Sequence, residues 1–502
     1  MSRRAAGVLL HPTSLPGRFG VGDLGPPADA FLDWVASAGL GLWQVMPLGP
    51  TGYWNSPYNN LSAFAGNSLL ISPEQLVADG LLPAAALEET PPFPADHVDF
   101  GPVIIWKRRL LRTSWKYALA NRRSLREELR AFEEDPAQKH WLSDWTLFAS
   151  LIGRNRAIAW TDWPREIVER EPAALDAARR ELAGQIEFRT YRQWLFFSQW
   201  ARVKREANRR GIRIVGDLPI YVAFGSADVW ANRRFFTVGT NGRQRTVAGV
   251  PPDYFSPTGQ LWGNPLYRWD VLSEDGYGWW IDRLRHNFRL ADLVRIDHFR
   301  GLSAYWEVNA GETTAMNGRW VKGPGLALFS EVRRALGDPA IVAEDLGSID
   351  DDVKALLSAT GFPGMSVLQF AFGDDDSLYL PHHHTPNSVV YTGTHDNDTT
   401  RGWWEALDST TRGKVRDYLG TDGREIAWDL IRAAFTSVAE RAIVPMQDVA
   451  GLGTEARMNT PGRPDGNWTW RARPEHFSDS AASRLRRLVS LTGRCARATG
   501  EA

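Results

Sequence analysis

The sequence predicts a (β/α)8 barrel, an α/β fold whose parallel strands alternate with helices and close on themselves, here with inserted, mainly helical subdomains over the carboxyl-terminal face. Eight short apolar segments recur along the 502 residues, each ends abruptly at polar, Gly or Pro residues, and helical sequence follows. An open doubly wound sheet is the alternative. The expected strands lie in residues 7–11, 41–46, 212–217, 293–298, 340–345, 365–370, 388–396 and 442–448, and the sixth is the weakest.

Helical sequence lies between several of these segments. Residues 27–38 carry apolar side chains at helical spacing, and Gly39 can end that helix. Residues 187–210 predict a longer helix that stops at Gly211. Strand and helix signals therefore alternate as the barrel requires.

We expect a single barrel domain over residues 1–502 with two insertions, 48–186 and 221–290. The first insertion contains residues 108–134, which are rich in Arg, Leu and Glu and predict one or two helices. The second, up to Gly278, is loop-like and full of Gly, Pro and aromatic residues. A loop of that length is uncommon unless it is functional, so we expect an aromatic lid.

The composition excludes several classes of protein. The 58 basic and 59 acidic residues nearly cancel, which argues against a nucleic-acid binder held by charge and against a polybasic membrane anchor. The single cysteine, Cys495, excludes a disulfide framework or a Cys-rich metal site within one chain. It favours a reducing compartment, and we expect a cytoplasmic protein. The chain contains no apolar run long enough for a membrane span and no secretory signal.

Four of the predicted strands end in a carboxylate: Asp217, Asp297, Glu344 and Asp396. The carboxyl ends of all strands open on one face of a barrel, and catalytic groups of this fold lie there. Each residue alone could merely cap the following helix. Four of them on separate strands indicate a site instead.

Two of these carboxylates have contrasting neighbours. Arg295 and Asp297 are two residues apart on one strand, so both face the lumen, and the guanidinium is expected to lower the pKa of Asp297 and keep it ionised. Glu344 follows three apolar residues, and a poorly solvated carboxyl has a raised pKa that suits a general acid. Oppositely tuned carboxyls are what glycosidic bond cleavage requires, although the sequence leaves retention or inversion open.

Aromatic and polar residues would flank this site. Residues 55–59 contain Tyr58, and residues 251–265 contain Gln260 and Trp262. Aromatic rings pack on sugar C–H faces while amides and carboxylates bind hydroxyls, and 23 Trp residues suit such a cleft. A rigid aromatic loop packed on the barrel, with most indoles in the core, explains the composition equally well.

Two other motifs predict no cofactor site. Residues 20–25 fit G-x-G-x-x-G, but no strand directly precedes them, and no acid follows where a dinucleotide site needs one. The three adjacent histidines 382–384 cannot all face one metal ion on a regular backbone. Neither motif therefore predicts a site for a metal or a dinucleotide.

In these motifs and their order, the sequence resembles the amylomaltases, or 4-α-glucanotransferases, which are relatives of the α-amylases. The resemblance covers almost the whole chain, from the first strand to about Trp470. The matching stretches are residues 7–17, 56–58, 216–221, 251–267, 295–301, 343–347, 394–397 and 455–462.

The resemblance implies a retaining transfer of α-1,4-glucan segments to the 4-hydroxyl of an acceptor glucan, without metal or cofactor. Asp297 would be the nucleophile, Glu344 the general acid and base, and Asp396 would stabilise the transition state. Substrate contacts are implied for Tyr58, Asp217, Gln260, Trp262, Arg295, His298, His395 and Asn467.

The implied partners are α-1,4-glucans such as maltooligosaccharides and amylose, with no nucleic acid and no membrane, and a monomer is expected. Trp54 stands where a smaller residue is expected, at the rim of the cleft. Two rival functions stay open, an α-glucan hydrolase of the amylase kind and a catalytically inactive glucan-binding protein. The sequence also leaves the formation of cyclic glucans open.

Overall fold

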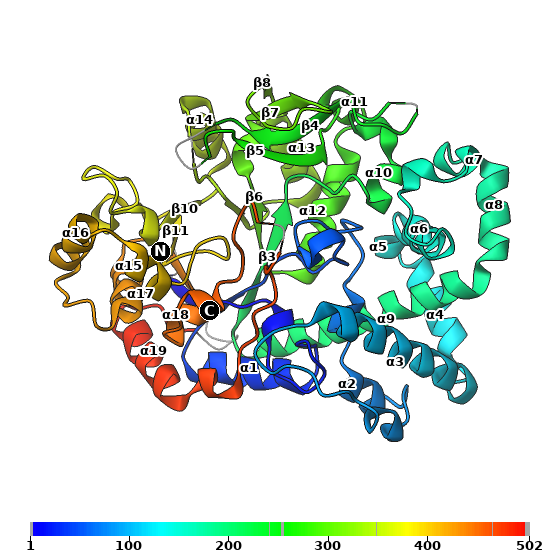
Figure 1. Cartoon of the computed structure of the whole chain (residues 1–502), viewed down its shortest axis with the longest axis horizontal. Helices are drawn as coiled ribbons and strands as arrows, with labels where there is room; N and C mark the ends of the chain where they lie inside the picture. The colour runs from blue at the N-terminus through cyan, green and yellow to red at the C-terminus, as the bar shows by residue number, and fades with distance from the viewer. Residues whose placement is uncertain (1–3, 240, 253–255, 348, 464, 497–502) are drawn as a thin grey trace.

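The centre of the computed structural model, which describes residues 4–239, 241–252, 256–347, 349–463 and 465–496, is an eight-stranded parallel sheet (Figure 1). Every predicted strand is present, and the barrel prediction is confirmed. The strands are β1 (Ala5–Leu9), β2 (Leu42–Gln44), β3 (Arg213–Pro219), β6 (Leu293–Asp297), β9 (Ile341–Ala343), β10 (Gly364–Val367), β11 (Ser388–Tyr391) and β12 (Arg441–Pro445). Their order in the sheet is β10-β11-β12-β1-β2-β3-β6-β9.

The two end strands of this order, β9 and β10, lie close together, so the sheet nearly closes into a barrel. The Ala343 N–H donates to the Pro363 carbonyl at 2.9 Å, and the Met365 N–H donates to Asp345 Oδ1 at 2.7 Å. These bonds join the chain across the seam between the end strands.

Side chains of alternate strand residues fill the lumen. One buried apolar cluster takes a residue from each of the eight strands, as the layered interior of such a barrel requires. On β3 this residue is Val215, and on β6 it is Leu293. Asp217 and Arg295 follow these residues by two positions, so the same alternation carries them into the lumen at its carboxyl end.

Helices surround the barrel and mostly agree with the predictions. α1 (Pro26–Ser37) and the 27-residue α9 (Ala183–Arg209) correspond to the predicted helices, and Gly39 (φ +73°) and Gly211 (φ +75°) follow them in the left-handed conformation. Among the helices that the structure describes, none has the length and apolarity that a membrane span requires. The remaining outer helices are α12 (Gly278–Leu290), α13 (Leu326–Leu336), α14 (Asp351–Thr360), α15 (Thr400–Ala406), α16 (Ser409–Leu419), α17 (Ile426–Thr436), α18 (Met446–Val449) and α19 (Asp479–Leu491).

Residues 48–186 contain a group of helices that packs on α9 through α3, α4 and α6. The segment predicted as one or two helices is two, which are α3 and α4. The group lies to the right of the barrel in Figure 1, and that it forms a subdomain of its own stays a prediction. Its helices are α2 (Pro73–Ala78), α3 (Phe100–Asn121), α4 (Leu125–Glu134), α5 (Pro136–Lys139), α6 (Leu142–Arg154), α7 (Arg165–Val168) and α8 (Pro172–Glu181).

The prediction that residues 221–278 are loop-like is wrong. They contain α10 (Ala227–Ala231), α11 (Trp269–Glu274) and two strands, β4 (Thr246–Val250) and β5 (Gln260–Pro265). β4 pairs with β7 (Ala304–Asn309), which pairs with β8 (Gly318–Lys322), so the insertions after β3 and β6 build one antiparallel sheet above β6 in Figure 1. Pairing between distant segments orders sequence whose Gly and Pro content is typical of loops.

Candidate active site

A buried guanidinium lies at the carboxyl end of the lumen. Arg295 is opposite Asp217 in the register of β6 with β3. Its Nη1 donates to both oxygens of Asp217, at 2.8 and 2.7 Å, and its Nη2 lies 2.8 Å from Asp297 Oδ1. Burial alone would lower the pKa of Arg295, but the two carboxylates raise it well above its usual value. One permanent cation therefore fixes two of the predicted carboxylates.

The electrostatics of Asp297 differ from the prediction. Burial raises its pKa to about 6, because the effect of burial exceeds the opposing effect of Arg295, and the charge of Asp217 adds to the rise. The prediction that Arg295 holds this pKa below its usual value is therefore wrong in its net result. The Arg295 contact, 2.8 Å from Nη2 to Oδ1, still favours the ionised form of Asp297.

Glu344 is held by the backbone instead of by a cation. Its Oε2 accepts from the His298 N–H at 2.6 Å, and its Oε1 accepts from the Leu346 N–H at 2.9 Å. Burial raises the pKa of Glu344 to about 7, and the charge of Asp297 adds to the rise. The predicted raised pKa of Glu344 is confirmed, and this carboxyl keeps its proton to a higher pH than Asp297 does.

His298 adopts a left-handed backbone conformation at the end of β6, with φ +54°. That conformation is costly for a residue with a side chain, and it aims the N–H of His298 at Glu344. Burial, and after it the charge of Arg300, lowers the pKa of the ring to about 3, so His298 is neutral. The strained backbone at His298 therefore helps to orient the carboxyl group of Glu344.

Tyr58 and His395 form a stack beside the ion cluster. Their rings lie 4.9 Å apart at an interplanar angle of 14°. The Tyr58 hydroxyl donates to Asp217 Oδ2 at 2.7 Å, and His395 Nε2 lies 3.4 Å from Asp396 Oδ2. The stack therefore connects the buried cluster to the third predicted catalytic carboxylate.

Trp262 and Gln260 reach the same region from β5 of the antiparallel sheet. The Trp262 ring meets the His298 ring edge to face at 4.7 Å, and its indole N–H donates to Gln260 Oε1 at 3.2 Å. Trp262 remains 37% exposed, so one part of the ring is open to a ligand. Residues 253–255 of the same insertion, which belong to a matching stretch, lie outside the described residues.

Asn467 uses its side chain within its own loop. Its Oδ1 accepts from the Thr460 N–H at 2.8 Å, and its Nδ2 donates to the Arg463 carbonyl at 2.7 Å. The next residue, Trp468, lies 5.7 Å from the Tyr58 ring and 5.9 Å from the His395 ring. The structure therefore brings the neighbour of Asn467 to the aromatic stack.

Sequence reasoning missed two residues of this site, Trp468 and Asn459. Asn459 Nδ2 donates to Asp396 Oδ1 at 2.6 Å. Both residues lie in stretches that the resemblance brings to attention, but neither ends a strand or carries a charge. Only the folded structure shows that Asn459 lies against Asp396 and that Trp468 lies against Tyr58 and His395.

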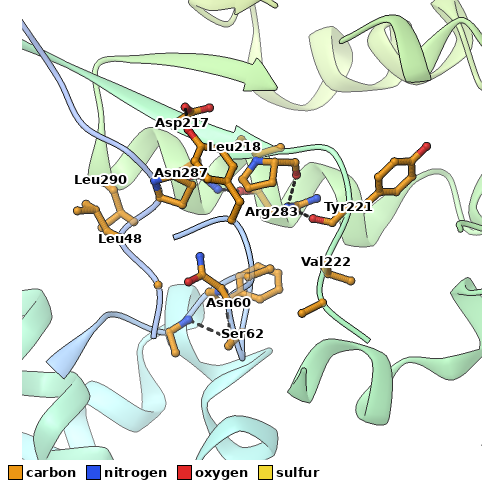
Figure 2. A pocket seen from close by; sticks show the side chains of 18 residues that line it. Leu48, Asn60, Ser62, Asp217, Leu218, Tyr221, Val222, Arg283, Asn287 and Leu290 are labelled. Atoms are coloured by element: carbon orange, nitrogen blue, oxygen red, sulfur yellow. Dashed lines mark hydrogen bonds between the residues drawn. The ribbon is translucent and has the colours of Figure 1, made fainter. Parts of the chain in front are cut away.

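A pocket extends from the ion cluster toward the first insertion (Figure 2). Asp217 of β3 lines it on the side of the barrel, and Tyr58 and Asn60 line it from the first insertion. Arg283 of α12 donates to the carbonyls of Pro219 and Ile220, which fixes the end of β3. Within the described ranges, no group of three His, Cys, Asp or Glu side chains is arranged to hold a metal ion.

The family model described as 4-alpha-glucanotransferase matches residues 10–476. The chain belongs to this family. The 4-alpha-glucanotransferase of Thermus thermophilus is 47% identical over 501 residues, which cover 98% of this chain and 99% of that protein. The chloroplastic/amyloplastic 4-alpha-glucanotransferase of Arabidopsis thaliana is 46% identical over 499 residues, which cover 98% of this chain and 86% of that protein.

Solved structures agree with this 4-alpha-glucanotransferase assignment. The amylomaltase from Streptococcus agalactiae in complex with acarbose has a TM-score of 0.95 and 36% identity, covering 98% of this chain and 100% of that one. The amylomaltase from Corynebacterium glutamicum, at 19% identity, a TM-score of 0.76 and coverage of 98% and 75%, supports the fold alone. The resemblance noted in the sequence is thus confirmed.

In this 4-alpha-glucanotransferase family member, Asp217→Ala should destabilise the fold and alter Asp297. The substitution leaves the buried Arg295 with one carboxylate partner instead of two, so the free energy of unfolding should fall by about 3–5 kcal/mol in urea denaturation. It also removes a charge that raises the pKa of Asp297, so the acid limb of any activity profile should move to lower pH.

The matched control is Asp176→Ala, which removes the carboxylate of a surface pair with Arg179. Because both side chains of that pair are exposed, the loss should be below about 1 kcal/mol. Equal stability losses in the two variants would contradict the view that the buried cluster of Arg295 with Asp217 and Asp297 stabilises the carboxyl end of the barrel.

Proposed function

We propose that this protein transfers α-1,4-glucan segments between maltodextrins by a retaining mechanism, and that the predicted site residues carry the reaction. The observation that carries the proposal is the contrast between two neighbouring carboxyls. Asp297 lies against a fixed cation, whereas Glu344 is buried against backbone amides and has a pKa of about 7. A nucleophile and a proton donor are the pair that a retaining mechanism needs.

In the first half of the reaction, Asp297 attacks the anomeric carbon of the donor glucan. Arg295, whose Nη2 lies 2.8 Å from Oδ1 of Asp297, holds this carboxylate in place for the attack. Glu344 donates its proton to the glycosidic oxygen as the bond from that oxygen to the anomeric carbon breaks. The products are a shortened glucan and a glycosyl ester on Asp297.

In the second half, the 4-hydroxyl of an acceptor glucan attacks the same carbon. Glu344, now ionised, takes the hydroxyl proton, and the ester bond to Asp297 breaks. Both carboxyls return to their starting states, and the configuration at the anomeric carbon is retained after two displacements.

The other predicted residues bind the sugar. Tyr58 stacks beneath the ring, Asp396 binds its hydroxyls and stabilises the transition state, and Trp262 and Gln260 contact neighbouring glucose units. The stack of Tyr58 on His395 and the edge-to-face contact of Trp262 with His298 hold these rings in place. Arg295, His298, His395, Asp217 and Asn467 complete the predicted substrate-binding set.

Transfer requires the ester to meet a sugar before it meets water. Aromatic surfaces on two sides of the site, Trp262 and the pair Tyr58 and Trp468, favour a sugar acceptor that can stack on them. An amylomaltase 36% identical to this chain binds acarbose, which supports a glucan-like ligand here. The monomeric state and the cytoplasmic location stay predictions.

Incubation with maltotriose tests the proposed activity. We expect glucose together with a ladder of longer maltodextrins, while the total number of reducing ends stays constant, because each transfer breaks one glycosidic bond and forms another. Chromatography of the products and a reducing-end assay measure both quantities. A rise of reducing ends in step with glucose, without longer products, would identify a hydrolase instead.

Asp297→Ala should lower the kcat of transfer by a factor of at least about 10³, because no ester can form. Glucan binding should stay measurable by calorimetry. Asp338→Ala is the matched control, since the side chain of Asp338 is 91% exposed beyond the amino-terminal end of β9. Turnover near the wild-type level in Asp297→Ala would remove Asp297 from the role of nucleophile.

The activity should have a narrow bell-shaped dependence on pH. Asp297 must be ionised, so kcat/KM should rise as the pH passes about 6, and Glu344 must be protonated, so kcat/KM should fall above about 7. Initial rates of glucose release from maltotriose across this range measure both limbs. A constant rate from about pH 5 to about pH 8 would show that these two carboxyls do not control the reaction.

A further inference from the structure

Asp396 lies in the segment after β11, which ends at Tyr391 and not at Asp396 as predicted, and a residue of the segment after β12 holds it. Arg295 reaches Asp297 from the same strand, and the backbone holds Glu344, but the side chain of Asp396 is 46% exposed at the cleft. Asn459 Nδ2 donates to its Oδ1 at 2.6 Å, and His395 Nε2 lies 3.4 Å from its Oδ2. Two neighbours thus fix the two oxygens separately.

The backbone of Asn459 is tied to that of Asp396. Arg457 Nε donates to the Asn459 carbonyl at 2.7 Å, and Arg457 Nη2 donates to the Asp396 carbonyl at 2.8 Å. One guanidinium therefore sets the distance between the segments after β11 and β12. The backbone of Asn459 is therefore held in place, and its side-chain amide donates to the Asp396 carboxylate from that position.

The segment that carries Asn459 is itself fastened to the barrel. Gln447 of α18 donates to the Ala456 carbonyl at 3.2 Å, and the Trp468 N–H donates to the Met458 carbonyl at 2.8 Å. Met458 and Trp468 are buried, at 5% and 6% exposure. The amide of Asn459 therefore sits on a supported segment and not on a free loop.

We propose that Asn459 is a positioning residue for Asp396, which orients this carboxylate toward the sugar through the hydrogen bond to Oδ1. The inference rests on the proposed function, because it assigns Asn459 a part in that reaction. A neutral amide suits the task, since it fixes one oxygen and leaves the negative charge of the carboxylate uncancelled for a cationic transition state. A Lys or Arg at this place would neutralise that charge.

Other charged or titratable groups surround Asp396, and the test must separate Asn459 from them. They are His395, Asp297 and Tyr58 on the cleft side and Arg457 on the loop side, with Asp398 at 4.0 Å from Arg457. All of them are unchanged in an Asn459 variant. The ratio of variant to wild-type rates at each pH therefore removes their shared contribution.

Two substitutions test the proposal by the rate of glucose release from maltotriose. Asn459→Ala removes the donor, so kcat should fall roughly 10- to 100-fold, the range of a hydrogen bond to a charged group, while KM stays within about threefold. Asn459→Asp places a second carboxyl at the same oxygen. The pair can share a proton at low pH and reproduce the bond, but the two charges repel each other at high pH. The ratio of N459D to wild-type kcat should therefore fall steadily with rising pH.

Asn317 offers a matched control, because its Nδ2 donates to Glu312 Oε2 at 3.3 Å on the exposed turn between β7 and β8. Asn317→Ala and Asn317→Asp change the same kind of pair and should leave kcat and its pH dependence at wild-type values. Thermal melting of each protein checks that it is folded, and the near-isosteric N459D protects the test if N459A does not fold.

The outcomes distinguish this inference from the proposed function. Absence of transfer in the wild-type protein would defeat the proposed function whatever the variants do. Transfer by the wild-type protein, together with a wild-type kcat in N459A or a pH-independent N459D ratio, would overturn the role of Asn459 alone. A loss in N459A that appears wholly in KM would make Asn459 a substrate contact, which also overturns the inference.

Discussion

The proposed chemistry of this protein depends on the contact of one guanidinium with two carboxylates inside the barrel. Arg295 neutralises one of the two negative charges of Asp217 and Asp297, so the cluster keeps an excess negative charge where burial makes solvation poor. Burial raises the pKa of Asp297 despite the opposing effect of Arg295, and the charge of Asp217 adds to the rise, so the ionised resting state is destabilised. In the proposed mechanism, the excess negative charge of the cluster complements the positive charge of an oxocarbenium-like transition state more than it complements a neutral substrate.

The two carboxyls of the proposed mechanism differ because the fold holds them in different ways. Asp297 is the last residue of β6 and meets a cation of the same strand, whereas Glu344 follows β9 and receives N–H groups from His298 and Leu346. Amide donors orient a carboxyl without supplying a full positive charge, so burial dominates its pKa. Adjacent barrel strands thus present an anion and an acid side by side, and the strained turn at His298 connects them.

The sequence predicts what short-range patterns encode. Abrupt apolar segments predict the strands, and the common face on which all strands of a barrel end predicts that the strand-end carboxylates lie together. The structure joins two of them, Asp217 and Asp297, through Arg295. The pairing of β4 with β7 is not predictable in this way, since the register joins segments more than fifty residues apart and β4 contains Gly249. The net pKa of Asp297 was likewise out of reach, because the degree of burial comes from the whole lumen and outweighs the visible neighbour Arg295.

Some tryptophans are buried in the barrel and its helices, and others reach the candidate site from elements beyond it. Trp43 on β2 and Trp200 on α9 are almost fully buried, and their indole N–H groups donate to the main-chain carbonyls of Leu10 and Leu290, so they stabilise the fold. Trp262 and Trp468, by contrast, come from the antiparallel sheet and from the loop after β12, and both meet histidines of the site. The strands supply charge at fixed positions, and in the proposed function the elements beyond them supply the surfaces on which a sugar displaces water. The proposed preference for a sugar acceptor over water therefore depends on how firmly those outer elements are held to the barrel.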